Sequence, residues 1–187
     1  MMKHIITEKS MYLKGVVGLF PANKSEDGED VHVYRTEQDR IDGKASHTFC
    51  MLRQQAEKEN DEPYMSMADF IAPKAYRDHI GMFAVSCFGC ESLVQKYESQ
   101  NDDYSKIMAQ ALADRFVEAF AEYIHREIRI NLWGYAKGET LDQSDLLKIK
   151  YEGIRPAPGC KLKQYSSFDI HLDIDSISHT LDLIMTA

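Results

Sequence analysis

The sequence predicts an α+β fold with an antiparallel sheet, on three observations. Short apolar segments bounded by turn residues come first along the chain, and a long segment with helical periodicity follows them. Regular alternation of strands and helices, which is typical of a parallel sheet, is absent. The 187 residues are 44% hydrophobic and 28% charged, which indicates a globular domain and excludes a disordered chain.

The first predicted strand covers residues 15–20, an apolar run that ends at a Pro-Ala-Asn sequence. A polar turn leads into residues 31–34, whose partial alternation predicts a second strand antiparallel to the first. On this strand His32 is expected to lie on the solvent face. Residues 4–13 have the pattern of the end of a helix.

Three further segments extend this pattern. Residues 48–55 are expected to form another strand or a short helix. Residues 67–73 are expected to form a loop or a 3₁₀ turn that Pro73 closes. The apolar run 80–86 predicts one more strand.

A helix over residues 102–131 is the clearest element. Asp102 and Asp103 provide an N-cap and a negative first turn. The chain is expected to leave this helix at Gly134, and a shorter helix is expected to run from Asp142 toward Tyr151. Helical spacing is shown by these apolar residues: Tyr104, Ile107, Met108, Ala111, Leu112, Phe116, Ala119, Phe120, Tyr123, Ile124 and Ile128.

A charged row lies on this predicted helix. Arg115, Glu118 and Glu122 share a strip with the apolar Ile107 and Ala111, and charges on an apolar strip need partners or water. The commoner explanation is a row of mutual salt bridges, worth a few tenths of a kcal/mol per pair. The alternative is that Glu118 faces a polar ligand cleft.

The charge balance limits the classes of partner. With 30 acidic against 22 basic residues, the formal net charge of −8 disfavours a nucleic-acid surface and binding to anionic membranes. No apolar run approaches the length of a membrane span, and residues 1–10 lack the apolar core of a secretory signal. The expected compartment is the cytoplasm.

The cysteines do not predict a metal site. Cys87 and Cys90 form a CxxC sequence, while Cys50 and Cys160 stand alone, with no second pair or histidines at ligand spacing. A redox motif would place CxxC at a helix N-terminus after a strand, and the surrounding sequence fits that loosely. We expect two reduced structural thiols, without stoichiometric zinc.

Residues 151–159, which read YEGIRPAPG, combine rigidity with a single cation. Pro156 and Pro158 each fix φ and favour extended geometry in the residue before them. Arg155 therefore begins a non-helical stretch whose backbone groups are not used by a helix. Such a stretch suits a ligand that needs both a cation and backbone hydrogen bonds. The alternative is a proline-rich connector with an exposed arginine.

Several segments, in this order and at these spacings, resemble the C-terminal activation domain of cobalamin-dependent methionine synthase. The resemblance covers residues 1–159 and implies an α+β unit with a twisted antiparallel sheet and a long central helix, present here in incomplete form. The matching segments are EKSMYLKGVVGLFPAN, DVHVYRTE, LRQQ, ADFIAPK, NDDYSKIMAQALADRFVEAFAEYIHREIR, WGYA and YEGIRPAPG.

The resemblance implies a role in a repair reaction. Domains of this family bind S-adenosylmethionine, whose methyl group regenerates methylcobalamin from cob(II)alamin while flavodoxin or a similar reductase supplies an electron. Cobalamin is then carried by another domain or chain. The protein would be a module of a methyltransferase, with no complete catalytic site, no catalytic residue and no metal ligand of its own.

The resemblance also implies ligand-binding residues. Arg155 matches the arginine that contacts the carboxylate of S-adenosylmethionine, and Pro156, Ala157 and Gly159 match its backbone-binding neighbours. Glu118 matches a glutamate that lines the same cleft, where a carboxylate can balance the sulfonium or the amine of the ligand.

The chain departs from the family pattern after Gly159. The family continues with a tyrosine, a Pro-x-x-Pro turn and His-Thr-Glu, whereas this chain continues with Cys160 and KLKQYSSFDIHLDIDSISHT. We therefore expect a partial activation domain over residues 1–159 and a divergent tail over 160–187, produced by a frameshift. The alternative is an edge strand, because Phe168, Ile170, Leu172 and Ile174 alternate with polar residues.

Two other functions remain open at this point. The segment before the matched region, which carries a ligand-binding aspartate in the family, has no counterpart, so the chain is expected to represent the middle of the domain. It would then act as a docking module for a corrinoid protein or flavodoxin without ligand binding, or be an inactive fragment. The other open function is that of a redox or metal protein based on Cys87 and Cys90.

Overall fold

The computed structural model describes residues 1–57, 61–156 and 178–185. The described residues divide into two compact units. The first unit contains Met1–Val17, Phe83–Glu139 and the first part of the last strand, and the second contains Gly18–Met82, Thr140–Pro156 and the end of that strand. The long strands therefore contribute to both units, and each unit is described here by itself.

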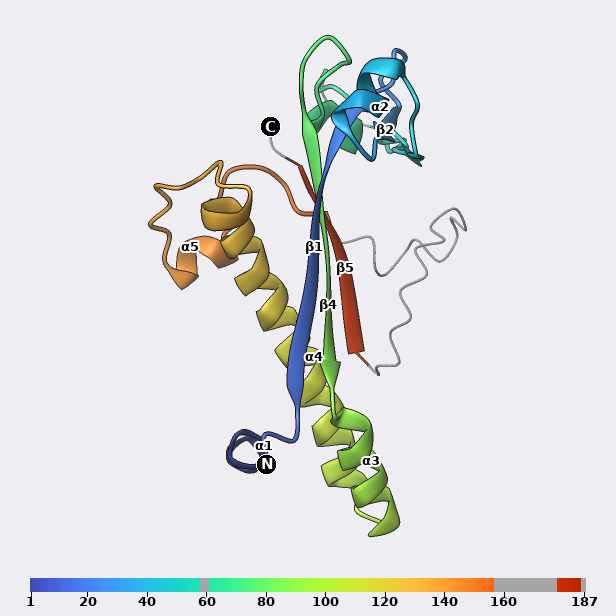
Figure 1. Cartoon of the computed structure of the whole chain (residues 1–187). Coiled ribbons are helices and arrows are strands. Elements are labelled where there is room, and N and C mark those ends of the chain that lie inside the picture. Colours follow the sequence, from blue (N-terminus) through green and yellow to red (C-terminus); the bar gives the residue numbers. More distant parts are fainter. Residues whose placement is uncertain (58–60, 157–177, 186–187) are drawn as a thin grey trace. The chain divides into compact units, whose positions relative to one another are not determined.

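Five strands of the described residues form one sheet, in the order β3-β2-β1-β4-β5. Figure 1 shows β1, β4 and β5 next to one another. The pairs β1–β2 and β2–β3 are antiparallel, with Asn23 opposite His32 and Val31 opposite Phe49. Together with the long helix α4, this confirms the predicted α+β class. The strands are β1 (Tyr12–Lys24), β2 (Asp30–Val33), β3 (His47–Cys50), β4 (His79–Phe88) and β5 (Ser178–Met185).

Strand β2 follows its predicted alternation, and β1 contains the strand predicted over residues 15–20, although β1 is longer and these residues are not buried as expected. Val31 and Val33 are buried, and His32 on the opposite face shares a hydrogen bond with Thr48 Oγ1 at 3.0 Å. β1 continues through Pro21 to Lys24 and is half-buried or exposed over most of its length. An apolar run therefore did not imply burial here.

The first unit contains three α-helices and one π-helix among its described residues. α3 and α4 pack against each other (Figure 1), and the Asp102 side chain caps α4 by accepting a hydrogen bond from Ser105 N at 3.0 Å, as predicted. The helices are α1 (Met2–Glu8), α3 (Cys90–Ser99), α4 (Asp103–Glu127) and the π-helix η2 (Ile128–Leu132).

The buried face of α4 differs from the predicted apolar face. Tyr104, Ile107 and Tyr123, which belong to the predicted apolar face, are 74%, 64% and 55% exposed, whereas Ile128 at the end of that face is fully buried. The strip of Arg115 and Glu118 therefore lies in solvent, and its charges need no buried partners. The buried residues of the helix are Ala109, Ala113, Val117, Ala121 and His125.

Close approach explains the glycine at position 15, where β1 meets α4. A Cβ atom at Gly15 would lie 3.3 Å from Phe120 Cε1 and 3.5 Å from Ile124 Cδ1. At the other end of the unit, Ile5, Leu93 and Ala109 form a buried cluster that joins α1, α3 and α4. This cluster buries apolar surface of α1, α3 and α4.

A buried ion pair fixes the chain that follows α4. Arg129 donates from Nε and Nη2 to the two carboxylate oxygens of Glu139, both at 2.6 Å. Both side chains are nearly inaccessible, at 1% and 6% exposure, so removal of either partner would leave an uncompensated charge in the core. The turn between them includes Gly134, whose positive φ of 75° ends the helix where the sequence predicted.

The second unit combines β2 and β3 with short helices. The expected 3₁₀ turn is present as η1, and its capping box joins Ser66 and Asp69. The shorter helix expected after Asp142 is α5, which Asp142 caps by accepting a hydrogen bond from Asp145 N at 2.8 Å. The bounds are α2 (Glu37–Asp42), η1 (Met67–Phe70) and α5 (Gln143–Leu147).

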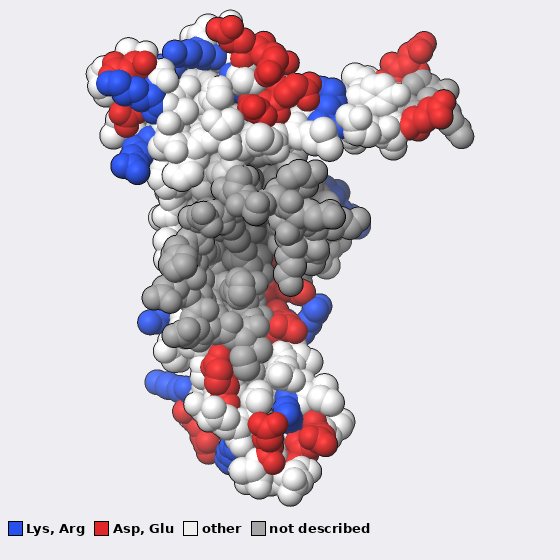
Figure 2. Space-filling model, turned by 90° about the vertical axis from the view of Figure 1, so that its right-hand side faces the viewer, with Lys and Arg blue, Asp and Glu red and all other residues white. Residues whose placement is uncertain are grey.

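Acidic and basic side chains are intermingled on the face that Figure 2 shows. Several opposite charges are paired, such as Lys106 with Glu98 and Lys150 with Asp145, both at 2.6 Å. Exposed pairs of this kind stabilise a fold by about 0–1 kcal/mol. In the part of the chain that the structure describes, no helix is long and apolar enough to cross a membrane.

Candidate ligand-binding site

Arg155 lies on a non-helical segment of the second unit, as the two prolines predicted. Gly153 turns the chain with a positive φ of 83°, and Ile154 then forms an isolated β-bridge. Arg155 and Pro156 follow without regular structure and are half-buried. Ala157, Pro158 and Gly159 lie outside the described residues. The segment thus holds a half-buried arginine on backbone that no helix uses.

Glu118 lies on the exposed side of α4 in the first unit. Its carboxylate pairs with Arg115 at 2.7 Å, one helical turn earlier, and both side chains are more than half exposed. This geometry matches the salt-bridge interpretation of the charged row. Arg155 and Glu118 belong to different units, so the structure does not bring these two predicted site residues together within one unit. Their shared role stays a prediction.

The CxxC sequence is at the junction of β4 and α3. Cys87 is the penultimate residue of β4, Gly89 is the N-cap of α3, and Cys90 is the first residue of α3. This is the position expected of a redox motif. Both thiols are buried, however, and burial raises the pKa of Cys87 and raises that of Cys90 to about 11. At neutral pH the unreactive thiol form is therefore favoured.

Metal binding has no support from side-chain geometry. Within the described ranges, no group of three or more His, Cys, Asp or Glu side chains is arranged to hold a metal ion. Cys50 is exposed and distant in sequence from the other thiols, and Cys160 is outside the described residues. The geometry of Cys87 and Cys90 is that of packed structural residues.

Sequence reasoning missed a network around Arg53 in the second unit. Its guanidinium binds Asp69 at 2.7 and 3.0 Å and Glu29 at 2.9 Å, and it donates to the carbonyl oxygen of Tyr64 at 2.7 Å. These hydrogen bonds and the Ser66 amide lower the pKa of Asp69 to about 2. The partners are 11 to 24 residues from Arg53 in the sequence, so local patterns carry no signal for the network.

Comparison with known families identifies the family of the chain. A family model described as "Vitamin B12 dependent methionine synthase, activation domain" matches residues 1–183. The chain belongs to this family. Membership of the activation-domain family agrees with the resemblance carried by the segments from EKSMYLKGVVGLFPAN to YEGIRPAPG.

A solved structure shows the same activation-domain fold. The crystal structure of the MetH reactivation domain bound to AdoHcy is 34% identical in sequence, with a TM-score of 0.82. The match covers 99% of this chain and 62% of that chain. The present chain therefore spans less than two thirds of the length of its solved relative.

The family match also extends beyond Gly159, where the visible resemblance ends. It reaches residue 183, and the described residues 178–185 form β5 in the sheet. The predicted strand around Phe168–Ile174 lies outside the described residues. The division at residue 159 and the frameshift stay predictions.

Proposed function

We propose that this chain is part of a methionine synthase activation domain that binds S-adenosylmethionine for the reductive methylation of cob(II)alamin. The observation that carries the proposal is the family match over residues 1–183, combined with a 34% identical relative that was solved with AdoHcy. AdoHcy is what S-adenosylmethionine becomes when it loses its methyl group. A fold that holds the product is suited to hold the methyl donor.

The residues around Arg155 fit the carboxylate end of such a ligand. A guanidinium presents two parallel N–H donors to a carboxylate, which the single ammonium of lysine does not reproduce. Half-burial of Arg155 on a backbone restrained by Pro156 reduces both competition from water and the conformational entropy lost on binding. Pro156, Ala157 and Gly159 would bind the ligand through their backbone groups.

Glu118 would supply negative charge to a cationic ligand. S-adenosylmethionine carries a sulfonium and an amine, and an exposed carboxylate can approach either by exchanging its partner Arg115. The Arg115–Glu118 pair is exposed and contributes little to stability, so the exchange would cost little.

The proposed task of this chain is to bind and orient. The bound S-adenosylmethionine supplies an electrophilic methyl group, and the proposal requires no acid, base or nucleophile from the protein. The cobalamin domain of methionine synthase and flavodoxin or a similar reductase are the proposed partners, in the cytoplasm. Family membership supports these assignments.

Calorimetric titration with S-adenosylmethionine tests the proposal. Arg155→Ala should weaken binding by about 1.5–3 kcal/mol, which is roughly 10- to 150-fold in Kd, because charge-assisted hydrogen bonds are lost. Arg155→Lys should recover only part of the affinity. Arg77→Ala is the matched control, because Arg77 is an exposed arginine of the same unit.

Two outcomes would contradict the proposal. Equal affinities of the wild type and Arg155→Ala would show that this arginine does not hold the ligand. Absence of binding by the wild type at millimolar ligand would instead favour the docking module, which a pull-down with a corrinoid protein or flavodoxin would then detect.

A further inference from the structure

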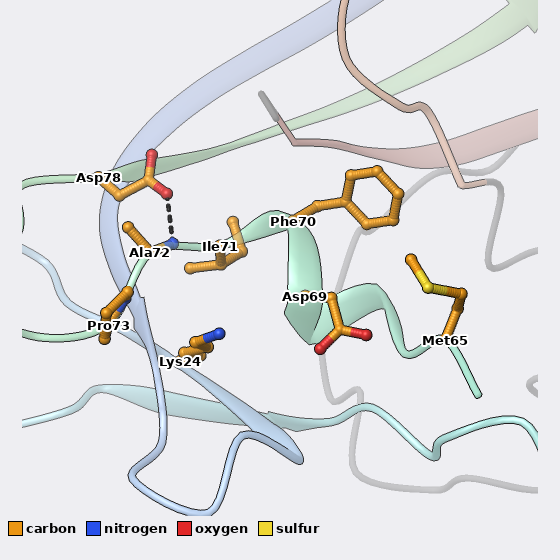
Figure 3. Close-up of a pocket in the computed structure, with 8 residues that line it drawn as sticks. All are labelled: Lys24, Met65, Asp69, Phe70, Ile71, Ala72, Pro73 and Asp78. Atoms are coloured by element: carbon orange, nitrogen blue, oxygen red, sulfur yellow. Dashed lines mark hydrogen bonds between the residues drawn. The ribbon is translucent and has the colours of Figure 1, made fainter. Parts of the chain in front are cut away.

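A cavity in the second unit is separate from the residues assigned to S-adenosylmethionine. Its volume is about 360 Å³, and it lies beside η1 and the segment that follows it (Figure 3). This volume is at the lower end of the range of small-molecule sites, about 300–1,000 Å³. Eight residues line it: Lys24, Met65, Asp69, Phe70, Ile71, Ala72, Pro73 and Asp78. Arg155 is not among them.

The two carboxylates of the cavity already have donors from the protein. Asp69 accepts hydrogen bonds from the Arg53 guanidinium at 2.7 and 3.0 Å and from Ser66 N at 2.9 Å. Asp78 accepts from Ala72 N at 2.7 Å and from His79 N at 2.8 Å (Figure 3). These bonds shape the cavity wall and occupy part of the lone pairs of both carboxylates, so fewer remain for a cationic ligand.

Lys24 is different, because its ammonium group has no hydrogen bond or ion pair with a described residue, although its charge acts on Asp69 and contributes to the lowered pKa of that carboxyl. The backbone of Lys24 is fixed: its N–H donates to Ala72 O at 3.1 Å, and it forms a parallel bridge with Pro73. The side chain is half-buried and points toward the side of the cavity where Asp69 lies (Figure 3). The unused hydrogen-bond donors of a charged group in the lining are therefore the three N–H groups of Lys24.

We propose that this cavity binds a small carboxylate with an apolar body. The carboxylate would accept hydrogen bonds from Lys24 Nζ, and the body would pack on Met65, Phe70 and Ile71. A single ammonium matches a single negative charge, and Asp69 and Asp78 would repel a phosphate dianion more strongly than a monoanionic carboxylate. The site is thus of a different class from the proposed S-adenosylmethionine site and does not depend on it.

The probe is 3-phenylpropanoate, compared with its neutral isostere 3-phenylpropanamide. NMR of the wild-type protein with labelled methyl groups should show 3-phenylpropanoate shifting the signals of Met65 and Ile71. The amide should bind about tenfold more weakly, since charge-assisted hydrogen bonds are about twice as strong as neutral ones. This comparison requires no variant and so does not depend on how a substitution folds.

Variants then assign the charge to one residue. Lys24→Gln should remove the preference for 3-phenylpropanoate, and Lys24→Arg should retain it. Lys44→Gln is the control, because Lys44 is an exposed lysine of the same unit that pairs with Asp42. Binding of S-adenosylmethionine should be unchanged in Lys24→Gln, which separates this site from the proposed function.

Three results would overturn the proposal. The first is equal binding of the acid and the amide by the wild type, and the second is an unchanged preference in Lys24→Gln. The third is displacement of 3-phenylpropanoate by inorganic phosphate at equal concentration, which would show a general anion site in place of one for apolar carboxylates.

Discussion

Gly89 shows how a single residue determines the geometry of the CFGC sequence. It has a φ of +89°, a conformation that glycine adopts at little cost and other residues seldom adopt. A Cβ atom at this position would lie 2.2 Å from the carbonyl oxygen of Ser10. The backbone can therefore approach Ser10 only at a glycine, and the motif has a structural explanation without metal or redox chemistry.

We expect Gly89→Ala to destabilise the protein by more than about 2 kcal/mol. The left-handed conformation alone costs about 1–2 kcal/mol for a residue with a Cβ, and displacement of Ser10 adds to it. Urea unfolding followed by circular dichroism measures the change. Gly138→Ala is the control, because no atom lies within 4 Å of a Cβ built there. Equal effects of the two substitutions would contradict this account.

Asp69 gives the second unit a defined acid sensitivity. Arg53 and the Ser66 amide hold its folded-state pKa at about 2, below the value of about 3.9 for an unfolded chain. Because the folded pKa is lower, the stabilisation is fully present above about pH 4 and is lost as the pH falls toward 2. Asp69→Asn should be less stable than the wild type at pH 7, and the difference should shrink at pH 2.5.

Urea unfolding at pH 7, 4 and 2.5 measures this difference. The exposed Asp61, changed to Asn, is the control, and it should leave the pH dependence close to that of the wild type. A difference between Asp69→Asn and the wild type that stays constant from pH 7 to 2.5 would show that the Arg53 pair does not act through this carboxylate.

At the scale of elements, α4 illustrates the limit of periodicity. Its buried positions Ala109, Ala113, Val117 and Ala121 are four residues apart and mostly small, which lets the helix approach its neighbours closely. Large apolar residues such as Tyr104 and Ile107 dominated the predicted face, yet they are exposed. A periodic pattern indicates that a helix is amphipathic. Which face of the helix becomes buried depends on the elements that pack against the helix.

Leucine substitutions on α4 test this assignment. Ala113→Leu should destabilise the protein by about 1–3 kcal/mol, because Ala113 is fully buried in a close-packed contact. Ala119→Leu, on the exposed side of the same helix, should change the free energy of unfolding by less than about 0.5 kcal/mol. Chemical denaturation measures both. A larger loss of stability for Ala119→Leu than for Ala113→Leu would contradict the buried face described above and support the face predicted from the sequence.

Local chemistry explains which elements the sequence predicted. The caps at Asp102 and Asp142 and the alternation of Val31 and Val33 act over a few residues and were visible. The helix α2 was missed because it is short, and α3, which begins at Cys90, was anticipated only by the redox interpretation of the CxxC sequence. Arg53 and the cavity at Lys24 were missed because their partners meet only in the folded chain.

For the whole molecule, the family was predictable because its segments are ordered along the sequence. No single segment is specific for the family. The combination of WGYA and YEGIRPAPG at the expected distance after a long amphipathic helix is specific for it. The site was predicted less completely. Arg155 is on the expected non-helical segment, whereas Glu118 is exposed and paired, and its role needs a ligand titration.

The origin of residues 160–187 is the remaining question at this scale. Our prediction is a frameshift after the codon of Gly159, because the visible resemblance ends abruptly there, whereas substitution erodes similarity unevenly. The competing account is that these residues are native to the protein and complete the sheet with β5. Two findings favour this competitor: the family match reaches residue 183, and β5 is a strand of the sheet.

The underlying DNA distinguishes the two accounts. Under a frameshift, another reading frame after the Gly159 codon should encode Tyr-Pro and then a segment like His-Thr-Glu. Resequencing the locus and translating all three forward frames is the measurement. Deletion of residues 178–187 provides an independent test, because a chance sequence stabilises nothing and its removal should leave the free energy of unfolding unchanged. If no such frame exists and the deletion destabilises the protein, β5 is a genuine strand and the frameshift is wrong.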